Sequence, residues 1–316
     1  MRKAIGIDIG GTNTRVAAVD EKGNVLQRTE FKTPRCRNPK DTVIEIFARV
    51  YGNNLLKKIK IVGCGVPAVI HPGTGFVDFA PNLGWKNFQI KKAVQGKFGI
   101  RKIVFENDAC CAAWGVYKLL KKKVHSLCVI TLGTGIGGGF ITGCRLYSGI
   151  DVSAFEIGHT VVDPNGRRCG CGSRGCLETF CGARHINKWA SKYWQKTKFA
   201  GRNLTPLEIA VEAGRGARWA KKIWEKYGEY LGISVASMIN ILAVDRIVFT
   251  GGIASAFPFF KNGLMRIVRE RTFPSYGERV KMTSVECNRY IGSIGAALLA
   301  LQKNGAGSGF ICVDHC

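Results

Sequence analysis

AIGIDIGGTNTRVAAVD at residues 4–20 and LCVITLGTGIGGGFITG at residues 127–143 are the two stretches that decide the fold. In each, an apolar strand runs into a corner of Gly and Thr, and a second strand then returns. The first copy continues through a turn at 21–24 into a third strand at 25–31, which makes an antiparallel meander. Two copies of one unit, whose starts lie about 123 residues apart, predict two homologous domains with a cleft between them.

The remaining segments predict an α/β fold around these two units. Amphipathic or small-residue patterns predict helices at 41–50, 89–97, 109–120, 220–238 and 291–301, and apolar runs predict strands at 60–66, 102–105 and 246–250. A stretch rich in Gly and Pro predicts a loop over 68–85. The final helix should pack back on the first domain. We therefore expect an N-terminal domain of residues 1–122 plus 291–303 and a C-terminal domain of residues 123–290.

The composition is that of a globular protein. Its 316 residues are 46% hydrophobic and 22% charged, which excludes a disordered or fibrous chain. No stretch approaches about 18 consecutive apolar residues, so a transmembrane helix is not expected. The first ten residues, MRKAIGIDIG, are too short and too acidic for an export signal, and we expect a cytoplasmic protein.

The charge balance is unusual, because 47 basic residues against 22 acidic ones give a net charge of +25. Such a charge favours polyanions in general and attracts anionic ligands. The basic runs 57–58, 91–92 and 121–123 stand mostly where helices are expected to end, and there they complement the helix dipole and solvate the surface. A general polyanion-binding protein is an alternative, and it would bind DNA with a steep salt dependence. We recognise no basic patch interleaved with aromatic residues that would support it.

The first Gly/Thr corner, from Asp8 to Thr12, has the composition of a phosphate-binding turn. Gly10 and Gly11 let backbone N–H groups approach a phosphate, and Thr12 adds a hydroxyl donor. Asp8 emerges from a buried strand, where its carboxylate can hold Mg²⁺ directly or through water. The alternative is an ordinary tight turn with an acidic residue beside it.

The second corner, at 133–138, matches the G-x-G-x-x-G pattern of dinucleotide-binding proteins. That fingerprint must open a helix, whereas residues 139–143 read as a strand and a turn. We therefore reject it, and with it Glu156 as a ribose-binding acid. No G-x-x-x-x-G-K-[ST] motif occurs either. Two facing Gly/Thr hairpins are instead how the superfamily of sugar kinases, heat-shock ATPases and actin holds a triphosphate, and Gly251-Gly252 stands where that superfamily closes on adenosine.

Four metal-binding side chains follow the second corner: His159, Cys169, Cys171 and Cys176. Their H-x9-C-x-C-x4-C spacing, with glycines between them that bend the chain, predicts a tetrahedral zinc site. No fifth ligand or open position is suggested, so the site is expected to be structural. Buried thiols are the alternative.

Asn107 and Asp108 stand where a strand meets the start of a helix. One interpretation is simple capping of the helix, which Asn and Asp do well. The functional alternative is a general base that takes a proton from a hydroxyl group as it attacks a phosphoryl group.

Together these motifs resemble those of the ROK family, which contains repressors and bacterial sugar kinases. The resemblance covers about residues 4–302 and rests on GIDIGGTNTR at 6–15, APNLGW at 80–85, ENDA at 106–109 and TLGTGIGGG at 131–139. EIGH at 156–159 followed by CGCGSRGCLE at 169–178 is its most telling part. Within the family the chain is most similar to the ATP-dependent bacterial glucokinases. This implies a two-domain actin-like ATPase (ribonuclease H-like) fold with a deep interdomain cleft.

The resemblance also implies roles for individual residues. Asp108 would be the general base for the 6-hydroxyl of the sugar, Asn82 and Asn107 would bind ring hydroxyl groups, and Glu156, His159 and Glu178 would hold the hydroxyl groups near the anomeric carbon. His159 would place one ring nitrogen on zinc and the other toward the sugar. The nucleotide and its Mg²⁺ would be bound by Asp8, Gly10, Gly11, Thr12, Thr131, Gly133, Thr134, Gly135, Gly137, Gly138, Gly251 and Gly252.

Two residues depart from the family pattern. Phe155 precedes EIGH where the family usually has Gly or Ala, and its ring is expected to reshape the sugar pocket. Cys111 stands where the family often has Asn, and we expect it to face helix packing rather than the sugar.

The leading hypothesis is an ATP- and Mg²⁺-dependent kinase for the 6-hydroxyl of a hexose. Glucose is the first candidate, with mannose, fructose, allose, N-acetylmannosamine and N-acetylglucosamine left open, and polyphosphate left open as donor. The alternative class is a sugar-sensing repressor. Such proteins carry a helix-turn-helix of roughly 60–80 residues before the first strand, which here begins at residue 3 or 4. Hexose and ATP are the expected partners, with no specific nucleic acid and no membrane, and relatives are often dimers.

Overall fold

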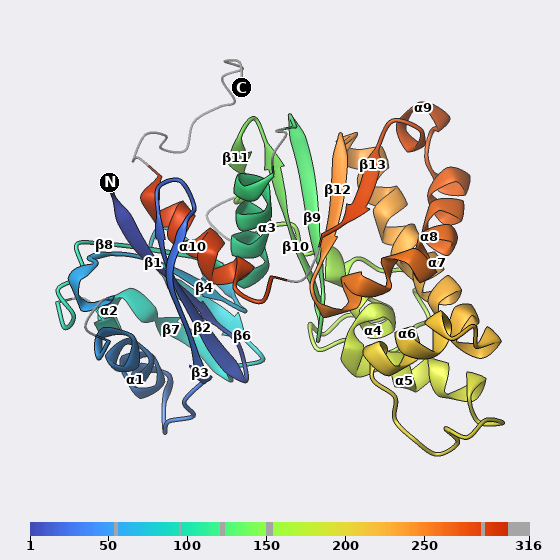
Figure 1. Ribbon diagram of the computed structural model, residues 1–316, viewed down its shortest axis with the longest axis horizontal. Coiled ribbons are helices and arrows are strands. Elements are labelled where there is room, and N and C mark those ends of the chain that lie inside the picture. The colour runs from blue at the N-terminus through green and yellow to red at the C-terminus, as the bar shows by residue number, and fades with distance from the viewer. Residues whose placement is uncertain (54–55, 95, 121–123, 150–153, 286–287, 303–316) are drawn as a thin grey trace. The chain divides into compact units, whose positions relative to one another are not determined.

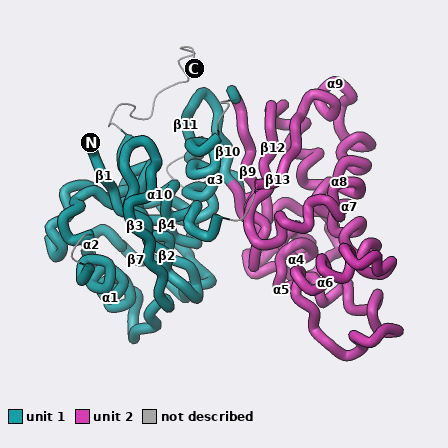
Figure 2. The backbone as a smooth tube through the Cα atoms, viewed as in Figure 1, with its two compact units in different colours: residues 1–125, 139–155, 288–316 teal, residues 126–138, 156–287 magenta. Residues whose placement is uncertain are grey.

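The computed structural model describes residues 1–53, 56–94, 96–120, 124–149, 154–285 and 288–302. The chain forms two compact units, coloured separately in Figure 2: unit 1 with residues 1–125, 139–155 and 288–316, and unit 2 with residues 126–138 and 156–287. Neither unit is one continuous segment. The domain boundaries expected from the sequence stay a prediction, and the basic run at 121–123 and the tail from 304 lie outside the described residues.

Unit 1 is built on a five-stranded sheet with the order β3-β2-β1-β4-β8 (Figure 1). Its strands are β1 (Lys3–Ile9), β2 (Asn13–Asp20), β3 (Val25–Lys32), β4 (Ile61–Val66) and β8 (Lys102–Asn107). The first three form the predicted antiparallel meander, whereas β4 runs parallel to both β1 and β8. The carboxyl ends of β1, β4 and β8 therefore meet at one edge of the sheet.

Alternation along β1 sends its side chains into two layers. Ile5, Ile7 and Ile9 are fully buried in a core that they share with the apolar side of helix α1 (Pro39–Tyr51). This layer also contains the short elements η1 (Leu56–Lys58) and α2 (Ile90–Val94). The isoleucines of the opening motif therefore pack only on the face of the sheet that α1 covers.

The other face of β1 is covered by helix α10 (Ile291–Leu301), which also packs on α3 (Asp108–Leu119). A methyl group added at Gly6 would overlap the carbonyl oxygen of Ser293, and one added at Gly63 would overlap that of Ala296. Backbone therefore lies against backbone, which only glycine permits in β1 and β4. The final helix was predicted to pack back on the first domain, and it packs on the sheet of unit 1.

A second sheet in unit 1 shows that the expected loop over 68–85 is wrong. This stretch contains β5 (Val69–His71) and β6 (Phe76–Ala80), and β7 (Trp85–Gln89) completes an antiparallel sheet in the order β5-β6-β7. Glycines occupy the turns, with Gly75 at a φ of 71° between the first two strands. The Gly content marked the turns correctly, but the strands between them are too short to show a clear period in the sequence.

The second large sheet repeats the order of the first, as β11-β10-β9-β12-β13. Its strands are β9 (Ser126–Leu132), β10 (Ile136–Thr142), β11 (Arg145–Leu146), β12 (Arg246–Thr250) and β13 (Lys281–Ser284). β12 is parallel to β9 and β13, just as β4 is parallel to β1 and β8. The internal repeat is thereby confirmed. The returning strand starts at Ile136, inside the corner expected at 133–138, so most of the glycine run lies within β10.

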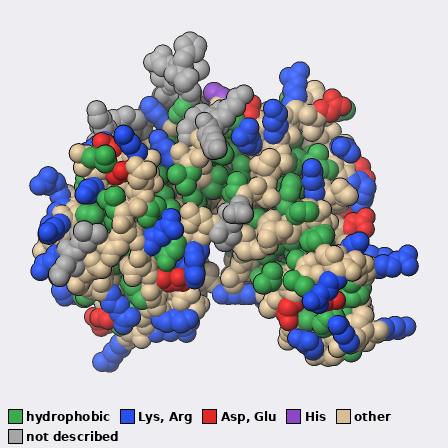
Figure 3. Space-filling model, in the orientation of Figure 1, with side chains coloured by type: hydrophobic (Ala, Val, Ile, Leu, Met, Phe, Trp, Pro, Cys, Tyr) green, Lys and Arg blue, Asp and Glu red, His purple; other side chains and the backbone are tan. Residues whose placement is uncertain are grey.

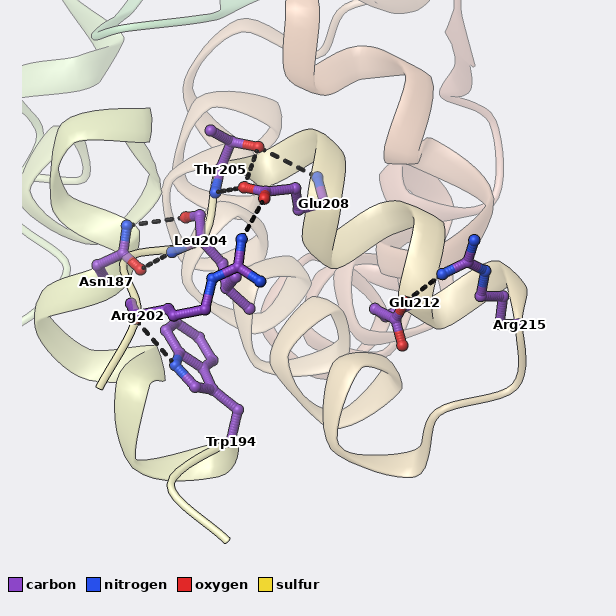
Figure 4. A network of polar contacts seen from close by, with 8 residues as sticks. All are labelled: Asn187, Trp194, Arg202, Leu204, Thr205, Glu208, Glu212 and Arg215. Atoms are coloured by element: carbon purple, nitrogen blue, oxygen red, sulfur yellow. Dashed lines mark hydrogen bonds and ion pairs between the residues drawn. The ribbon is translucent and has the colours of Figure 1, made fainter. Parts of the chain in front are cut away.

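Helices make up most of unit 2. They are α4 (Glu178–Cys181), α5 (Ala183–Ala190), α6 (Pro206–Gly214), α7 (Arg218–Leu242), α8 (Phe257–Arg271) and α9 (Pro274–Gly277), with 3₁₀ turns η2 (Ile157–His159), η3 (Ser191–Tyr193) and η4 (Gly252–Ala256). Figure 4 shows how α6 begins: Thr205 and Glu208 form a capping box, and Arg202 pairs with the same glutamate. Among the described helices, none has the length and apolar character needed to cross a bilayer.

Gly63→Ala is expected to destabilise the protein, because the added methyl group meets the backbone of Ala296 and neither segment is free to move. We expect the free energy of unfolding to fall by about 1–3 kcal/mol, the usual range for overpacking. Gly73→Ala is the matched control, since nothing lies within 4 Å of its added methyl group. Thermal and urea denaturation measure both variants, and equal stabilities would contradict the close seating of α10.

Candidate functional site

In unit 1, the first Gly/Thr corner joins β1 to β2 and is held by polar contacts. The N–H of Gly10 donates to the carbonyl of Asn13 at 3.0 Å, and the Thr33 hydroxyl donates to the carbonyl of Gly10 at 2.6 Å. Thr12 is exposed at the tip of the turn. A methyl group added at Gly11 would lie 3.0 Å from the carbonyl oxygen of Asn82. The structure thus brings the corner and Asn82 together.

Two carboxylates act on each other beside this corner. Asp8 is the next-to-last residue of β1, and Asp108 is the first residue of α3, directly after β8. Burial raises the pKa of Asp8 to about 7, and the negative charge of Asp108 adds to the rise. A bound cation would relieve both effects. The donor set therefore fits Mg²⁺, which proteins usually hold through one or two carboxylates.

Arg15 is a site residue that the sequence analysis missed. It is the cross-strand partner of Asp8 in the β1–β2 hairpin, and its charge lowers the pKa of that carboxyl against the effect of burial. Its guanidinium also pairs with Glu30 of β3 at 3.2 Å. The signal was present in the sequence, because a hairpin that closes at 10–13 must place residue 15 opposite residue 8.

Asn107 caps helix α3, as the structural interpretation of this residue predicts. Its Oδ1 accepts hydrogen bonds from the N–H groups of Ala109 at 2.8 Å and Cys110 at 3.2 Å, and its Nδ2 donates to the carbonyl of Ala68 at 3.2 Å. Asp108 is held by the N–H of Ala109, which donates to its Oδ1 at 2.9 Å. Because Asn107 fills the cap, the carboxylate of Asp108 is not needed for it.

The two departures from the family pattern have different surroundings. Cys111 is fully buried, and a methyl group added at Gly65 would lie 3.2 Å from its sulfur, so its expected place in the helix packing is confirmed. Phe155 has a φ of 73°, in the left-handed region that favours glycine, and its ring stacks on Phe140 with a centroid distance of 6.3 Å. The effect of Phe155 on a sugar pocket stays a prediction.

In unit 2, the second Gly/Thr corner joins β9 to β10. Because β10 begins at Ile136, the G-x-G-x-x-G pattern leads into a strand, which confirms that it is not a dinucleotide fingerprint. The N–H of Ile136 donates to Glu178 Oε2 at 2.9 Å, so this carboxylate supports the corner. Gly251, at a φ of 97°, approaches the backbone of Leu132, and Gly251-Gly252 therefore adjoins the same corner.

Three residues expected to bind sugar act on one another in unit 2. Burial raises the pKa of the Glu156 carboxyl, the charge of His159 opposes this rise, and the charge of Glu178 adds to it. Because Glu178 also holds Ile136, this acidic group is tied to the second corner. The predicted site residues thus lie in two groups, one in each unit, and each group is brought together by its own unit.

His159, Cys169, Cys171 and Cys176 gather their ligand atoms within 4.8 Å of one another. His159 Nδ1 lies 3.6 Å from Cys169 Sγ, and the sulfurs of Cys171 and Cys176 are 3.7 Å apart. Tetrahedral zinc with its usual bond lengths requires about 3.6 Å between N and S and about 3.8 Å between two sulfurs. Burial also raises the pKa of Cys176 to about 12, so an ionised thiolate at Cys176 needs a cation. The residues fit zinc, and Nε2 of His159 is the ring nitrogen left outside the cluster.

The sequence analysis recognised no basic residues interleaved with aromatic ones, but in unit 2 basic side chains do lie over aromatic rings. Cations stack on Tyr193, Phe199 and Tyr230 through Lys192, Lys198, Arg202 and Lys226. These ring faces are covered by the chain's own cations, whereas stacking of nucleic-acid bases needs open faces. Figure 3 shows Lys and Arg spread over both units on the face in view. The arrangement favours a solvated basic surface.

Comparison with known proteins finds one matching family and relatives that include glucokinases. The profile of the ROK family matches residues 4–303. The glucokinase of Streptomyces coelicolor is 33% identical over 80% of this chain and 83% of its own, and that of Thermotoga maritima is 30% identical over 96% and 98%. A xylose repressor of Caldicellulosiruptor bescii and an N-acetylmannosamine kinase of Escherichia coli, each 28% identical, are further relatives.

Among solved structures, a ROK family glucokinase from Streptomyces griseus in complex with glucose and AMPPNP is similar, with a TM-score of 0.80 and 28% identity. The similarity covers 94% of this chain and 98% of that one. Together with the repeated strand order, it confirms the predicted α/β fold of the actin-like ATPases.

Zinc analysis tests the cysteine cluster. Purified protein is expected to contain about one zinc ion per chain, since the four donor atoms lie within 4.8 Å of one another and their chemistry suits tetrahedral zinc. Cys176→Ser should lose most of the metal and lower the denaturation midpoint. Cys36→Ser, at an exposed free cysteine outside the cluster, should lose neither. Metal-free protein of full stability would contradict the assignment.

Asp8→Asn is expected to stabilise the metal-free protein at alkaline pH. The pKa of Asp8 is about 7 in the folded protein against an ordinary 3.8, so the folded state holds the proton more tightly. The wild-type protein therefore loses stability relative to the variant as pH rises from about 4 to 7, and the difference stays constant above that range.

Thermal midpoints of both proteins across pH 4–9, without divalent ions and then with Mg²⁺, measure this effect. Mg²⁺ should raise the wild-type midpoint more than that of the variant. If the difference in thermal midpoint between the two proteins does not change with pH, ionisation of Asp8 does not destabilise the folded protein.

Proposed function

Because the chain belongs to the ROK family, we propose that it transfers the γ-phosphoryl group of ATP to the 6-hydroxyl of a hexose, with glucose as the first candidate. The observation that carries the proposal is the pair of carboxylates, Asp8 and Asp108, beside the turn at residues 10–12. A phosphoryl transfer needs one group to take a proton and another to hold a cation, and this pair can supply both. The glucokinases among its relatives support the same reaction.

Asp108 is the proposed general base. It takes the proton of the sugar hydroxyl as that oxygen bonds to the γ-phosphorus, while the bond from the phosphorus to the leaving oxygen of ADP breaks. The N–H of Ala109 orients its carboxylate, and the Asn107 cap fixes the start of the helix that carries it. The base is thus set on a rigid element rather than on a loop.

Asp8 is the proposed magnesium-binding residue, with Arg15 as a fixed positive charge across the hairpin. When bound, Mg²⁺ supplies neutralisation of the charge on the transferring phosphoryl group. The backbone N–H group of Gly11 and the hydroxyl of exposed Thr12 are proposed to bind phosphate oxygens, while the N–H of Gly10 closes the turn on the carbonyl of Asn13. The roles expected for the remaining residues of the sugar and nucleotide sites stay predictions.

The identity of the sugar has a second candidate class, the N-acetylhexosamines. The N-acetylmannosamine kinase among the relatives favours it, and the ring of Phe155 directly before Glu156 is a departure that bears on pocket shape. A non-catalytic sugar-sensing regulator is the other candidate, favoured by the xylose repressor. A regulator would bind sugar without turning over ATP.

An ADP-release assay with glucose, mannose, fructose, allose, N-acetylmannosamine and N-acetylglucosamine tests the proposal directly. We expect sugar-dependent ADP release, highest with glucose. The same panel with polyphosphate in place of ATP identifies the donor when the sugar phosphate formed is measured, because that reaction releases no ADP. Sugar binding by calorimetry without any ADP release would overturn the kinase and favour the regulator.

Asp108→Asn is expected to lower kcat by about 10²–10⁴-fold, the range for loss of a general base. Sugar affinity should change little, because an asparagine oxygen can still accept from the N–H of Ala109. Asp41→Asn, which removes an exposed carboxylate in α1, is the control and should keep full turnover. Near-normal turnover in the Asp108 variant would remove that residue from the mechanism.

A further inference from the structure

Unit 1 contains a cavity at the amino end of β8, away from the candidate site. Its volume is about 260 Å³, and it is lined by Lys91, Val94, Ile100, Arg101, Lys102 and Ile103. These residues come from α2 and from the chain that enters β8. Six residues of extended strand separate Lys102 from Asp108, a distance of about 20 Å. The cavity is therefore separate from the carboxylate pair.

The cavity combines three cations with an apolar floor. Val94 is fully buried, and Ile100 and Ile103 are partly buried. Within the described part of the chain, neither Lys91, Arg101 nor Lys102 forms an ion pair with a carboxylate. Burial, and then the charge of Arg2, lower the pKa of Lys102. The described residues that line the cavity thus carry three positive charges and no carboxylate.

The backbone and one ammonium group of this cavity are already held in place. The N–H groups of Arg101 and Lys102 both donate to the carbonyl of Lys60, at 2.8 and 3.1 Å. Lys102 Nζ donates to the carbonyl of Gln302, directly after α10, at 2.8 Å. A lysine ammonium has three donors, so two remain for a ligand. A site whose donors are positioned in advance loses less freedom on binding.

We propose that this cavity binds a dianionic phosphoryl group carried by a small molecule. Such a group presents a charge near −2 and three acceptor oxygens, which matches a cavity lined by three cations better than a single carboxylate does. The guanidinium of Arg101 can donate to two of the oxygens at once. The volume is below the roughly 300–1,000 Å³ of sites for drug-sized ligands, which suits inorganic phosphate or a phosphorylated monosaccharide rather than a polymer.

Calorimetric titration at low salt tests the proposal, with inorganic phosphate and glucose 6-phosphate as separate ligands and glucose as the uncharged control. The site variant is Lys91→Ala/Arg101→Ala. Its matched control, Lys221→Ala/Lys222→Ala, removes two exposed cations from α7 in unit 2. We expect saturable binding to the wild-type protein, an affinity at least tenfold weaker in the site variant, and no change in the control.

A tenfold loss with either phosphorylated ligand supports the site, and the ligand affected identifies the source of the phosphoryl group. Equal affinities in the site variant and its control, or no saturable binding of either ligand to the wild-type protein, would overturn the proposal. Thermal denaturation of both variants establishes that they are folded. Because the readout is binding, the inference stands or falls independently of the proposed kinase activity.

Discussion

Unit 1 depends on the close contact between α10 and the backbones of β1 and β4. Glycine at positions 6 and 63 lets the helix lie directly on the strands, and Gly295 of the helix lies equally close to the backbone of α3. This contact holds together the elements that carry Asp8 and Asp108. The geometry of the carboxylate pair is therefore set by main-chain packing, which leaves less freedom than contacts between long side chains. A site that must place two like charges together needs such a rigid support.

Much of the fold can be predicted from the sequence because its strongest signals are patterns that extend over many residues. The repeat at 4–20 and 127–143 predicts two sheets of one design, and both have the same strand order. The short strands β5 and β6 were missed because three to five residues cannot establish an alternation that differs from a turn-rich loop. The start of β10 was misplaced for a related reason, since consecutive glycines carry no side-chain pattern and only hydrogen bonding to a neighbouring strand assigns them.

The site shows the same division between local and non-local information. Spacing alone predicts the ligand cluster around His159, because three of its donors lie within eight residues and the loop between them closes on itself. The raised pKa of Asp8 could not be predicted in that way. It depends on burial by α10 and on Asp108, which are distant in the sequence. Glu178 supporting the second corner is also non-local, since only the folded chain brings its carboxylate to Ile136.

The seating of α10 also has a consequence for biosynthesis. β1 leaves the ribosome early, whereas its covering helix is translated about 290 residues later. At about 5–20 residues per second, that interval is roughly 15–60 s. During this time the glycine-lined faces of β1 and β4 have no helix to cover them, while the segments of unit 2 are already being made. Nascent chains therefore pass this whole interval with unit 1 incomplete. A stop codon before residue 291 would remove α10, and unit 1 would stay exposed to aggregation and to cellular proteases.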